Sequence, residues 1–295
     1  MAATILDGRA LAQVLRTELQ AEIDTFKERY AVTPTIAVLR AGEDPASVSY
    51  AGMIEKGFLN RGMGFVPRIL PETASQSEIV RAVGELNADE SVHGVMIQEP
   101  LPRGIDEASV KAALSADKDV DGVHPINAGR LAQVAPVGRP PGVGAYFVPA
   151  TPAGGLELLK RNDIPLEGRQ AVVLGRSNIV GKPMALLLLR ENATVTVCHS
   201  RTAELPQVCR QADVLCVAVG RAKMVKGSWV KPGAVVIDFG VNFLDGKMCG
   251  DVDFDDAAEV AGMITPVPGG TGPMTNVMLM RNVLEAARRQ VEASS

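Results

Sequence analysis

The sequence lacks the features that mark nucleic-acid-binding, secreted and membrane proteins. It has no run of basic residues and a formal net charge of −4, so it offers no electrostatic surface for nucleic acid. Its longest apolar run, residues 184–189, is far too short to cross a bilayer. The N-terminus has no basic region and is interrupted by Asp7, which argues against a signal peptide.

Cysteine is also scarce and unpatterned. The four cysteines form no Cys-x-x-Cys pair, and Cys198 and Cys216 lie in apolar runs typical of buried strands. This usage favours a reducing compartment, so the sequence predicts a cytoplasmic protein. No metal site is predicted.

What the sequence does contain indicates an α/β protein of two domains. The chain has 295 residues, 46% of them apolar and 22% charged, which is enough to form ordinary cores. Short apolar runs alternate with helical periodicity, and this order favours parallel strands. Strands are expected at 35–39, 65–70, 94–97, 171–174, 194–198, 214–218 and 234–237. Helices are expected at 8–28, 44–62, 107–114, 151–159, 179–191 and 276–291, and a further helix is expected to begin at Ser75. A Pro/Gly-rich loop at 136–144 suggests a boundary. We therefore assign 1–148 plus 276–295 to an N-terminal α/β domain and 149–275 to a Rossmann-type domain.

Polar residues follow the apolar run 94–97 and predict a ligand site. Gln98 ends this run, and three acids, Asp117, Asp119 and Asp121, lie in the turn that comes later. In open α/β folds ligands bind at the carboxyl ends of the strands. A strand followed by a solvated acidic turn would show the same pattern.

A second candidate site begins at Gly175, between a buried strand and a helix. Gly175 suits a tight turn and Gly181 suits close packing of the helix on the strand, as in dinucleotide-binding folds. Ser177 replaces the middle glycine of the usual fingerprint, and a plain strand–turn–helix remains the alternative. The cofactor-binding residues expected in this segment are Gly175, Arg176, Ser177, Ile179, Val180 and Gly181.

The end of the next strand favours NADP over NAD. An NAD enzyme normally has an acid here for the ribose hydroxyl, whereas this chain has Ser200 and Arg201. Together with Arg176 they suggest a pocket for a 2′-phosphate. His199 is interpreted as a polar residue at the strand end. Gly220 and Gly240 follow later strands and are expected at the same edge.

Five motifs in order carry a resemblance that covers almost the whole chain. They are Gln98-Glu99-Pro100-Leu101-Pro102, Lys118-Asp119-Val120-Asp121-Gly122, Thr151-Pro152-x-Gly154, Gly175-Arg176-Ser177-x-x-Val180-Gly181-x-Pro183, and Thr265-Pro266-Val267-Pro268-Gly269-Gly270-x-Gly272-Pro273-Met274-Thr275. In these motifs the chain resembles the methylenetetrahydrofolate dehydrogenase/cyclohydrolase family.

The resemblance implies a homodimer of two-domain subunits, with the folate substrate in the cleft between the domains. In the dehydrogenase step a hydride moves from the methylene carbon of 5,10-methylenetetrahydrofolate to the nicotinamide of NADP. In the cyclohydrolase step water opens the methenyl product to 10-formyltetrahydrofolate. Hydride transfer needs chiefly positioning, because the cofactor supplies the chemistry.

Roles for particular residues also come from the resemblance. Tyr50 is expected to stack on the folate ring, and Asp121 to hydrogen-bond it. Gln98 is expected to support a proton-transferring lysine four residues after the tyrosine. Further substrate contacts are expected from Pro100, Leu101, Pro268, Gly269 and Gly270.

The chain departs from the family pattern at that lysine. The pattern is Ser-x-x-Tyr-x-x-x-Lys; Ser47 and Tyr50 match it, but Ile54 stands at the lysine position. Lys56 points about 120° away from the Tyr50/Ile54 face of a regular helix, so it could substitute only if the helix were bulged. We therefore expect a dehydrogenase with weak or absent cyclohydrolase activity. The ordinary bifunctional enzyme, with Lys56 substituting, is the alternative.

Other departures fall near the same expected cleft. Glu99 stands where the family usually has an apolar residue, the loop 136–147 is longer than usual, and Ala150, Thr271 and Asn276 also differ. They leave open an altered folate pocket or a catabolic role. Two further functions fit the sequence less well. The Gly175 and Gly269-Gly270 segments argue against a folate-binding protein without turnover. A dehydrogenase of hydroxy or amino acids would need a Lys–Asp or His–Asp pair.

Overall fold

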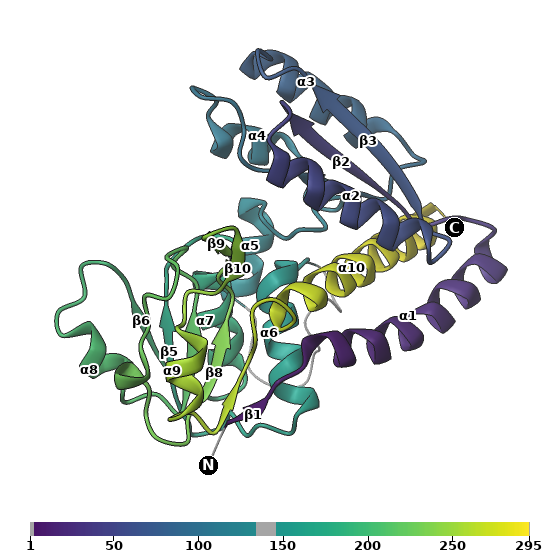
Figure 1. Ribbon diagram of the computed structural model, residues 1–295. Coiled ribbons are helices and arrows are strands. Elements are labelled where there is room, and N and C mark those ends of the chain that lie inside the picture. The colour runs from purple at the N-terminus through teal and green to yellow at the C-terminus, as the bar shows by residue number, and fades with distance from the viewer. Residues whose placement is uncertain (1–2, 134–145, 295) are drawn as a thin grey trace. The chain divides into compact units, whose positions relative to one another are not determined.

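The computed structural model describes residues 3–133 and 146–294, and their contacts divide the chain into two compact units (Figure 1). We call them the three-stranded unit, built mainly from Arg16–Leu131 with the C-terminal segment from Leu279, and the six-stranded unit, built mainly from Thr151–Met278 with the N-terminal segment to Leu15. The sequence placed this N-terminal segment with the other domain. The predicted loop 136–144 falls wholly within residues 134–145, outside the described residues.

The three-stranded unit has a parallel sheet in the order β3-β2-β4. Its elements are α1 (Gly8–Tyr30, which begins in the other unit), β2 (Thr35–Ala41), α2 (Pro45–Leu59), β3 (Gly64–Leu70), α3 (Gln76–Ala88), β4 (Gly94–Ile97), α4 (Glu107–Ala113), α5 (Pro125–Gln133) and the later part of α10 (Thr271–Ser294). Figure 1 shows α2 and α3 on opposite sides of β2 and β3. A buried cluster including Leu39, Val83 and Val95 joins the sheet to α3 and α4.

Local signals in the sequence explain how these helices begin. The Asp44 carboxylate accepts a hydrogen bond from the Ser47 N–H at 2.9 Å, with Pro45 at the first position of α2. Helix α3 begins with the capping box predicted at Ser75 and Glu78. Both starts were predicted from the sequence and are confirmed.

The six-stranded unit has a parallel sheet in the order β1-β11-β8-β7-β5-β6. Its elements are β1 (Thr4–Ile5), α6 (Ala150–Arg161, whose first residue belongs to the other unit), β5 (Gln170–Leu174), α7 (Gly181–Arg190), β6 (Thr194–Cys198), α8 (Leu205–Cys209), β7 (Val214–Val217), a 3-10 turn (Gly227–Trp229), β8 (Val235–Asp238), β9 (Asn242–Leu244), β10 (Lys247–Cys249), α9 (Phe254–Ala258) and β11 (Met263–Ile264). The chain order of the strands reverses between β5 and β7, and ligands bind at such switch points at the carboxyl ends of the strands.

The parallel α/β class is confirmed, but several local predictions need correction. Thr151 lies inside α6, which begins at Ala150, and α7 begins at Gly181 rather than at residue 179. The strand β1 was not predicted because it pairs with β11, which is distant in the chain. The antiparallel hairpin of β9 and β10 was also missed. These strands have two or three residues, too few for a periodic signal.

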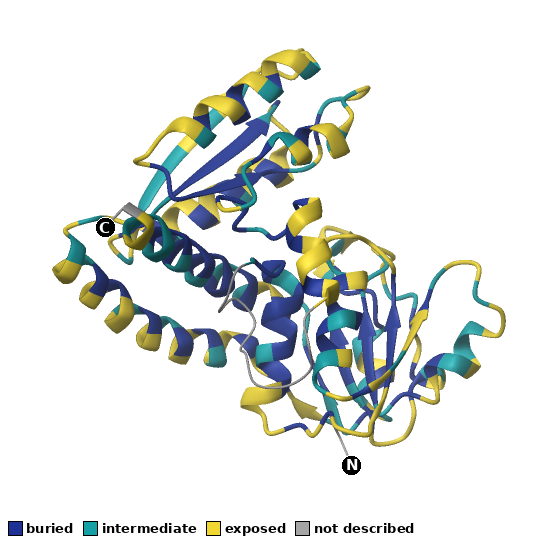
Figure 2. Cartoon of the chain, turned by 180° about the vertical axis from the view of Figure 1, so that it is seen from behind, coloured by how far each residue is buried: buried dark blue, intermediate teal, exposed yellow. Residues whose placement is uncertain are grey.

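Burial follows the sheets of both units. Figure 2 shows buried positions along the strands and exposed positions on the outer faces of helices such as α3. Cys198 and Cys216 are fully buried and unpaired, as predicted for small apolar residues. Among the described residues, no helix combines the length and the apolar character that a membrane span needs.

Candidate functional site

In the three-stranded unit, the predicted polar edge lies where β4 ends. The Gln98 N–H donates to the Leu39 carbonyl at 2.8 Å, which continues the pairing of β4 with β2. The next residue is tied to α2, because the Ser47 hydroxyl donates to the Glu99 carbonyl at 3.3 Å. The strand end and the helix that carries Tyr50 are thereby held to each other.

The acidic turn after α4 is a buried, hydrogen-bonded loop rather than a solvated one. Its centre is Asp119, which is fully buried. Its carboxylate accepts hydrogen bonds from the His124 N–H at 2.7 Å, from the Asn127 side chain at 2.8 Å and from the Val123 N–H at 3.1 Å. Asn282 of α10 supports the same loop by donating to the Val120 carbonyl at 2.8 Å. The structure therefore fixes the backbone on both sides of Asp121.

This loop leads to a prediction about stability. Replacing Asp119 with alanine would leave two backbone donors and one side-chain donor without their buried acceptor, and we expect the free energy of unfolding to fall by about 3 kcal/mol or more. Thermal unfolding followed by circular dichroism measures the change. The exposed Asp117, two residues earlier, is the matched control, and its alanine variant is expected to melt like the wild type. Equal melting of both variants would show that Asp119 does not organise the loop.

The charge of Asp121 influences the ionisation of Tyr50. Burial raises the pKa of the Tyr50 hydroxyl above its usual range, and the Asp121 carboxyl raises it further, so the tyrosine stays neutral. Burial also raises the pKa of Asp121 to about 7, with a further contribution from the charge of Asp119. The three-stranded unit thus holds a neutral tyrosine and, acting on it, a carboxyl whose pKa is raised to about 7.

Helix α2 presents Ile54, and not a lysine, on the face that carries Tyr50. The helix is continuous from Pro45 to Leu59, without a bulge. Ile54 is fully buried, whereas Lys56 is exposed. The side-chain oxygen of Gln98 is buried and has no hydrogen-bond partner. A buried acceptor without a donor is costly, and it marks a place where a donor is missing or where a ligand binds.

In the six-stranded unit, the loop after β5 is built around two close backbone contacts. Gly175 has a φ of 128°, and a Cβ there would lie 2.1 Å from the Ala218 carbonyl oxygen at the end of β7. A Cβ at Gly181 would lie 2.3 Å from the Gly175 carbonyl oxygen. Only glycine allows these approaches. The two glycine roles predicted from the sequence correspond to these contacts, at the switch point of the sheet.

Ser177 has a structural role that a glycine could not supply. Its hydroxyl accepts hydrogen bonds from the N–H groups of Val180 at 3.1 Å and Gly181 at 3.2 Å, at the start of α7. Such N–H groups form the positive end of a helix and bind phosphate in many proteins. In this chain the Ser177 hydroxyl takes up two of these N–H groups, and the Lys182 N–H donates to the Ser177 carbonyl at 3.0 Å.

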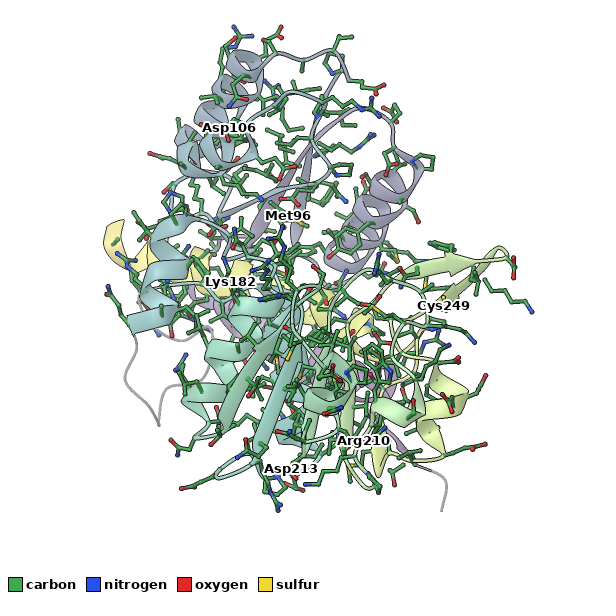
Figure 3. The ribbon with its side chains drawn as sticks, turned by 90° about the vertical axis from the view of Figure 1, so that its left-hand side faces the viewer. Met96, Asp106, Lys182, Arg210, Asp213 and Cys249 are labelled. Atoms are coloured by element: carbon green, nitrogen blue, oxygen red, sulfur yellow. The ribbon has the colours of Figure 1, made fainter. Side chains whose placement is uncertain are left out.

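The end of β6 lies beside the same loop, because the Gly175 N–H donates to the Cys198 carbonyl at 2.9 Å. His199 holds the following turn, since its Nδ1 accepts from the Arg201 N–H at 3.1 Å. Ser200, Arg201 and Arg176 are exposed. In Figure 3, Lys182 at the start of α7 lies at the opposite end of this unit from Asp213, which precedes β7. The candidate residues therefore gather at the carboxyl edge of the sheet.

Asp251 organises this edge, and its role was missed by the sequence analysis. It is fully buried and accepts hydrogen bonds from three consecutive N–H groups, those of Val219 at 2.6 Å, Gly220 at 2.9 Å and Arg221 at 2.7 Å. Asp238 similarly accepts from the Gly240 N–H at 2.8 Å. No local sequence signal reveals Asp251, because it lies about thirty residues from the loop that it holds.

The Pro268-Gly269-Gly270 segment also belongs to the six-stranded unit, where it contacts the start of α1. The Arg9 N–H donates to the Gly269 carbonyl at 3.1 Å, and a Cβ at Gly8 would lie 1.8 Å from the Gly270 carbonyl oxygen. Gly269 has a φ of 114°. This contact explains why the N-terminal segment packs with the six-stranded unit.

Comparison with protein families identifies both parts of the chain. Residues 6–121 match the catalytic domain of tetrahydrofolate dehydrogenase/cyclohydrolase, and residues 149–291 match the NAD(P)-binding domain of the same family. The chain belongs to this family.

Similar proteins support the family assignment over the full length. The bifunctional protein FolD of Roseiflexus sp. (strain RS-1) is 52% identical over 99% of this chain and 98% of its own. The crystal structure of FolD from Campylobacter jejuni is 40% identical, with a TM-score of 0.92 over 98% of this chain and 99% of that one. FolD of Trypanosoma brucei, crystallised with NADP cofactor and an inhibitor, is 34% identical, with a TM-score of 0.91 over 99% of both chains. This chain is therefore an enzyme of the tetrahydrofolate dehydrogenase/cyclohydrolase family.

Within this family member, the predicted site residues divide between the units. Of the residues expected to contact folate, the three-stranded unit contains Tyr50, Gln98, Pro100, Leu101 and Asp121, and the six-stranded unit contains Pro268, Gly269 and Gly270. The six-stranded unit also contains all the cofactor candidates, which are Gly175, Arg176, Ser177, Ile179, Val180, Gly181, Ser200, Arg201, Gly220 and Gly240. The charge of Asp121 acts on Tyr50, whereas Lys56 is exposed.

Proposed function

We propose that the protein is an NADP-dependent 5,10-methylenetetrahydrofolate dehydrogenase whose cyclohydrolase step is weak or absent. The observation that carries this proposal is on α2, where a fully buried isoleucine stands at the lysine position of the family pattern. The unpartnered Gln98 oxygen supports it, because Gln98 is the residue that the resemblance pairs with that lysine. Isoleucine cannot transfer a proton, and loss of a general acid or base commonly costs ~10²–10⁴-fold in rate.

The remaining groups of the three-stranded unit suit folate binding and hydride transfer. The Tyr50 ring would stack on the folate ring, and the Asp121 carboxylate would accept hydrogen bonds from ring N–H groups. Neither role needs a mobile proton. The hydride leaves the substrate's methylene carbon with its electron pair, so the products are the methenyl cation and the reduced cofactor.

The cofactor edge of the six-stranded unit fits a dinucleotide. Gly175 and Gly181 let the turn pack closely between β5, β7 and α7, and the positive N-terminal end of α7 would face the pyrophosphate. When bound, NADP supplies the hydride acceptor. The protein's part is to hold the cofactor, and Ser200 and Arg201 would bind its 2′-phosphate.

Cofactor preference provides the first test of this site. Replacing Arg201 with alanine removes a charge-assisted contact to the 2′-phosphate, so we expect the KM for NADP to rise about 10–100-fold and that for NAD to change little. Steady-state kinetics with both cofactors measures the split. Arg210, which binds the Ser228 carbonyl near the other edge of the sheet, offers the control R210A. Equal losses with NAD and NADP would remove Arg201 from the 2′-phosphate site.

A second candidate function is the ordinary bifunctional enzyme, which the names of the similar FolD proteins favour. In that case Lys56 would have to act from the exposed side of α2. A paired assay on the purified protein separates the candidates: one reaction follows NADPH formation from methylenetetrahydrofolate, and the other follows loss of methenyl absorbance. Hydrolysis well above the buffer rate would overturn the monofunctional proposal. Folate binding without either reaction would favour a binding protein.

We further propose a cytoplasmic homodimer. The dimer comes from the family resemblance. The β9–β10 hairpin and the residue before it also expose the apolar side chains of Val241, Phe243, Leu244 and Met248, a surface of the kind that subunits bury. The buried, unpaired thiols of Cys198 and Cys216 suit a reducing compartment. Sedimentation equilibrium measures the assembly state, and a monomer at assay concentrations would contradict the dimer.

A further inference from the structure

A cavity of the three-stranded unit is lined by none of the predicted folate or cofactor residues. Its volume is about 940 Å³, within the range of small-molecule sites, ~300–1,000 Å³. Thr35, the first residue of β2, and His93, which precedes β4, lie in its wall, and Gln290 of α10 donates to the His93 carbonyl at 2.7 Å. Gln98 follows the other end of β4. This cavity, which we call the His93 cavity, is therefore at the opposite edge of the sheet from the polar edge.

His93 brings an unused hydrogen-bond donor to this cavity. The residue is 6% exposed, and its Nδ1 accepts a hydrogen bond from the Thr35 N–H at 3.2 Å, so the neutral ring carries its proton on Nε2. Burial lowers the pKa of His93 and the charge of Lys118 lowers it further, whereas Asp89 raises it; the net shift favours the neutral ring. In the part of the chain that the structure describes, Nε2 has no hydrogen-bond partner, and it is not one of the unpartnered polar atoms that are closed to solvent. The Nε2–H group therefore opens into the cavity that His93 lines.

Lys118 brings a cation to the same cavity. It is 8% exposed, and its ammonium donates to the Leu86 carbonyl at 3.2 Å and to the Asp89 carbonyl at 2.6 Å, at the end of α3. The negative end of a helix is equivalent to about half a charge, so it offsets this cation only in part. Among residues 3–133 and 146–294, no carboxylate forms an ion pair with this ammonium. An ammonium has three donors, so one donor and part of a buried charge remain for a ligand.

The rest of the wall limits the kind of ligand. Glu90 and Asp117 line the cavity and are exposed, so their carboxylates lie on its solvent side. Two carboxylates disfavour a polyanion and favour a ligand with a positive group at its far end. Val32 and Val291 are partly buried and supply apolar surface to the same wall. The cavity therefore suits a ligand with one carboxylate, an apolar middle and one cationic end.

We propose that the His93 cavity binds a small amino carboxylate, whose carboxylate accepts hydrogen bonds from His93 Nε2 and from the Lys118 ammonium. The apolar part of this ligand lies against the two valines, and its own ammonium faces Glu90 and Asp117. The charge-assisted hydrogen bond from Lys118 supplies the larger share of the affinity. The site is independent of the proposed function, because it uses none of the residues assigned to folate or NADP.

Histidine signals provide a direct test, because the chain has three histidines. The full-length protein, with isotope-labelled histidine, is titrated with 6-aminohexanoate while the NMR signals of the imidazole rings are followed. We expect the His93 signal to shift with a Kd on the order of 1 mM, because one charged and one neutral contact to a small ligand are weak. His124 and His199 accept backbone N–H groups elsewhere in the chain, and their signals should not shift. The signal that is lost in H93N is assigned to His93.

Related probes test each end of the ligand. Hexylamine lacks the carboxylate and should not shift the His93 signal. Hexanoate lacks the ammonium and should bind several-fold more weakly than 6-aminohexanoate. In the double variant E90Q/D117N this advantage of 6-aminohexanoate should disappear, because the carboxylates that face its ammonium are gone. Both substituted residues are exposed, so this variant should fold like the wild type.

Substitutions of the two donors complete the test, with affinities measured by calorimetric titration. K118M removes the ammonium and should weaken 6-aminohexanoate binding at least about 10-fold, whereas K118R should keep most of the affinity. H93N keeps an acceptor for the Thr35 N–H but places no donor at the position of Nε2, so binding should weaken several-fold. The control is K27M, because Lys27 also donates to a backbone carbonyl, that of Gly62 at 3.0 Å, but lies outside the cavity. Its affinity should equal that of the wild type.

Several results would overturn the site. One is a His93 signal that does not move at about ten times the expected Kd. Movement of the His124 or His199 signal alone would place the probe elsewhere. Hexylamine binding as tightly as 6-aminohexanoate, or K118M binding as tightly as K27M, would show that no carboxylate is recognised at Lys118. If K118M does not fold, the hexylamine comparison and the E90Q/D117N variant decide the question. The outcome of the dehydrogenase assay has no bearing on this site.

Discussion

Replacing Ile54 with lysine is expected to raise methenyltetrahydrofolate hydrolysis about 10²–10⁴-fold over the wild type, because it would supply the general acid or base that the family pattern places in the proposed folate site. The position suits the change: it lies one helical turn after Tyr50 on a continuous helix. Under the proposed function, the buried Gln98 oxygen, which has no hydrogen-bond partner, would accept a hydrogen bond from this ammonium group. The rate of loss of methenyl absorbance, corrected for the buffer rate, measures the gain.

Two matched variants separate this explanation from its rival. I54M introduces a flexible apolar side chain of similar length without an ammonium, and it should leave hydrolysis at the wild-type level. K56M removes the exposed lysine and should change neither activity if Lys56 has no catalytic role. Hydrolysis that is already present in the wild type and is lost in K56M would instead establish Lys56 as the substitute, acting from the exposed face of α2.

The dehydrogenase activity of I54K is expected to stay within about an order of magnitude of the wild type, because hydride transfer depends on positioning rather than on a proton-transferring side chain. The substitution is also expected to lower the stability of the protein, because a lysine replaces a fully buried isoleucine. Desolvation of an unpaired ammonium costs several kcal/mol, and the Gln98 oxygen would offset part of it. Melting temperature and NADPH formation should therefore be measured together for each variant.

Features that depend on neighbouring residues were predictable from the sequence. The capping box at Ser75, the N-cap at Asp44 and the strand that ends before Gln98 each combine local signals, and the structure confirms them. The close contacts of Gly175 and Gly181 were also indicated, because a turn between a buried strand and a helix restricts which residues fit.

Features that depend on distant residues were not predictable from the local pattern. Asp251 holds the N–H groups at Gly220 from about thirty residues away, and β1 forms a sheet edge with β11 at the other end of the chain. The partner of Glu99 was missed for a similar reason, because Lys111 reaches it from a later helix. In each case a charge or a short strand has no periodic pattern, and only the folded chain shows its partner.

The Gly175 loop leads to the largest expected effect on cofactor binding. In G175A the new Cβ would lie 2.1 Å from the Ala218 carbonyl oxygen, and alanine would also have to adopt a φ of 128°. Relief of the clash requires movement of the loop that joins β5 to α7. Overpacking and backbone strain each cost about 1–3 kcal/mol, so we expect NADP affinity to fall about 100-fold. Calorimetric titration with NADP measures the loss.

Gly233 provides a control that separates the clash from the strain. Gly233 also has a positive φ, 81°, but a Cβ there would meet no atom within 4 Å. It precedes β8, at the edge of the sheet opposite the cofactor candidates. G233A should therefore lose about 1 kcal/mol of stability and keep its NADP affinity. If G175A bound NADP as tightly as G233A does, the cofactor could not depend on the close approach between β5 and β7. The site would then have to be sought away from the switch point of the sheet.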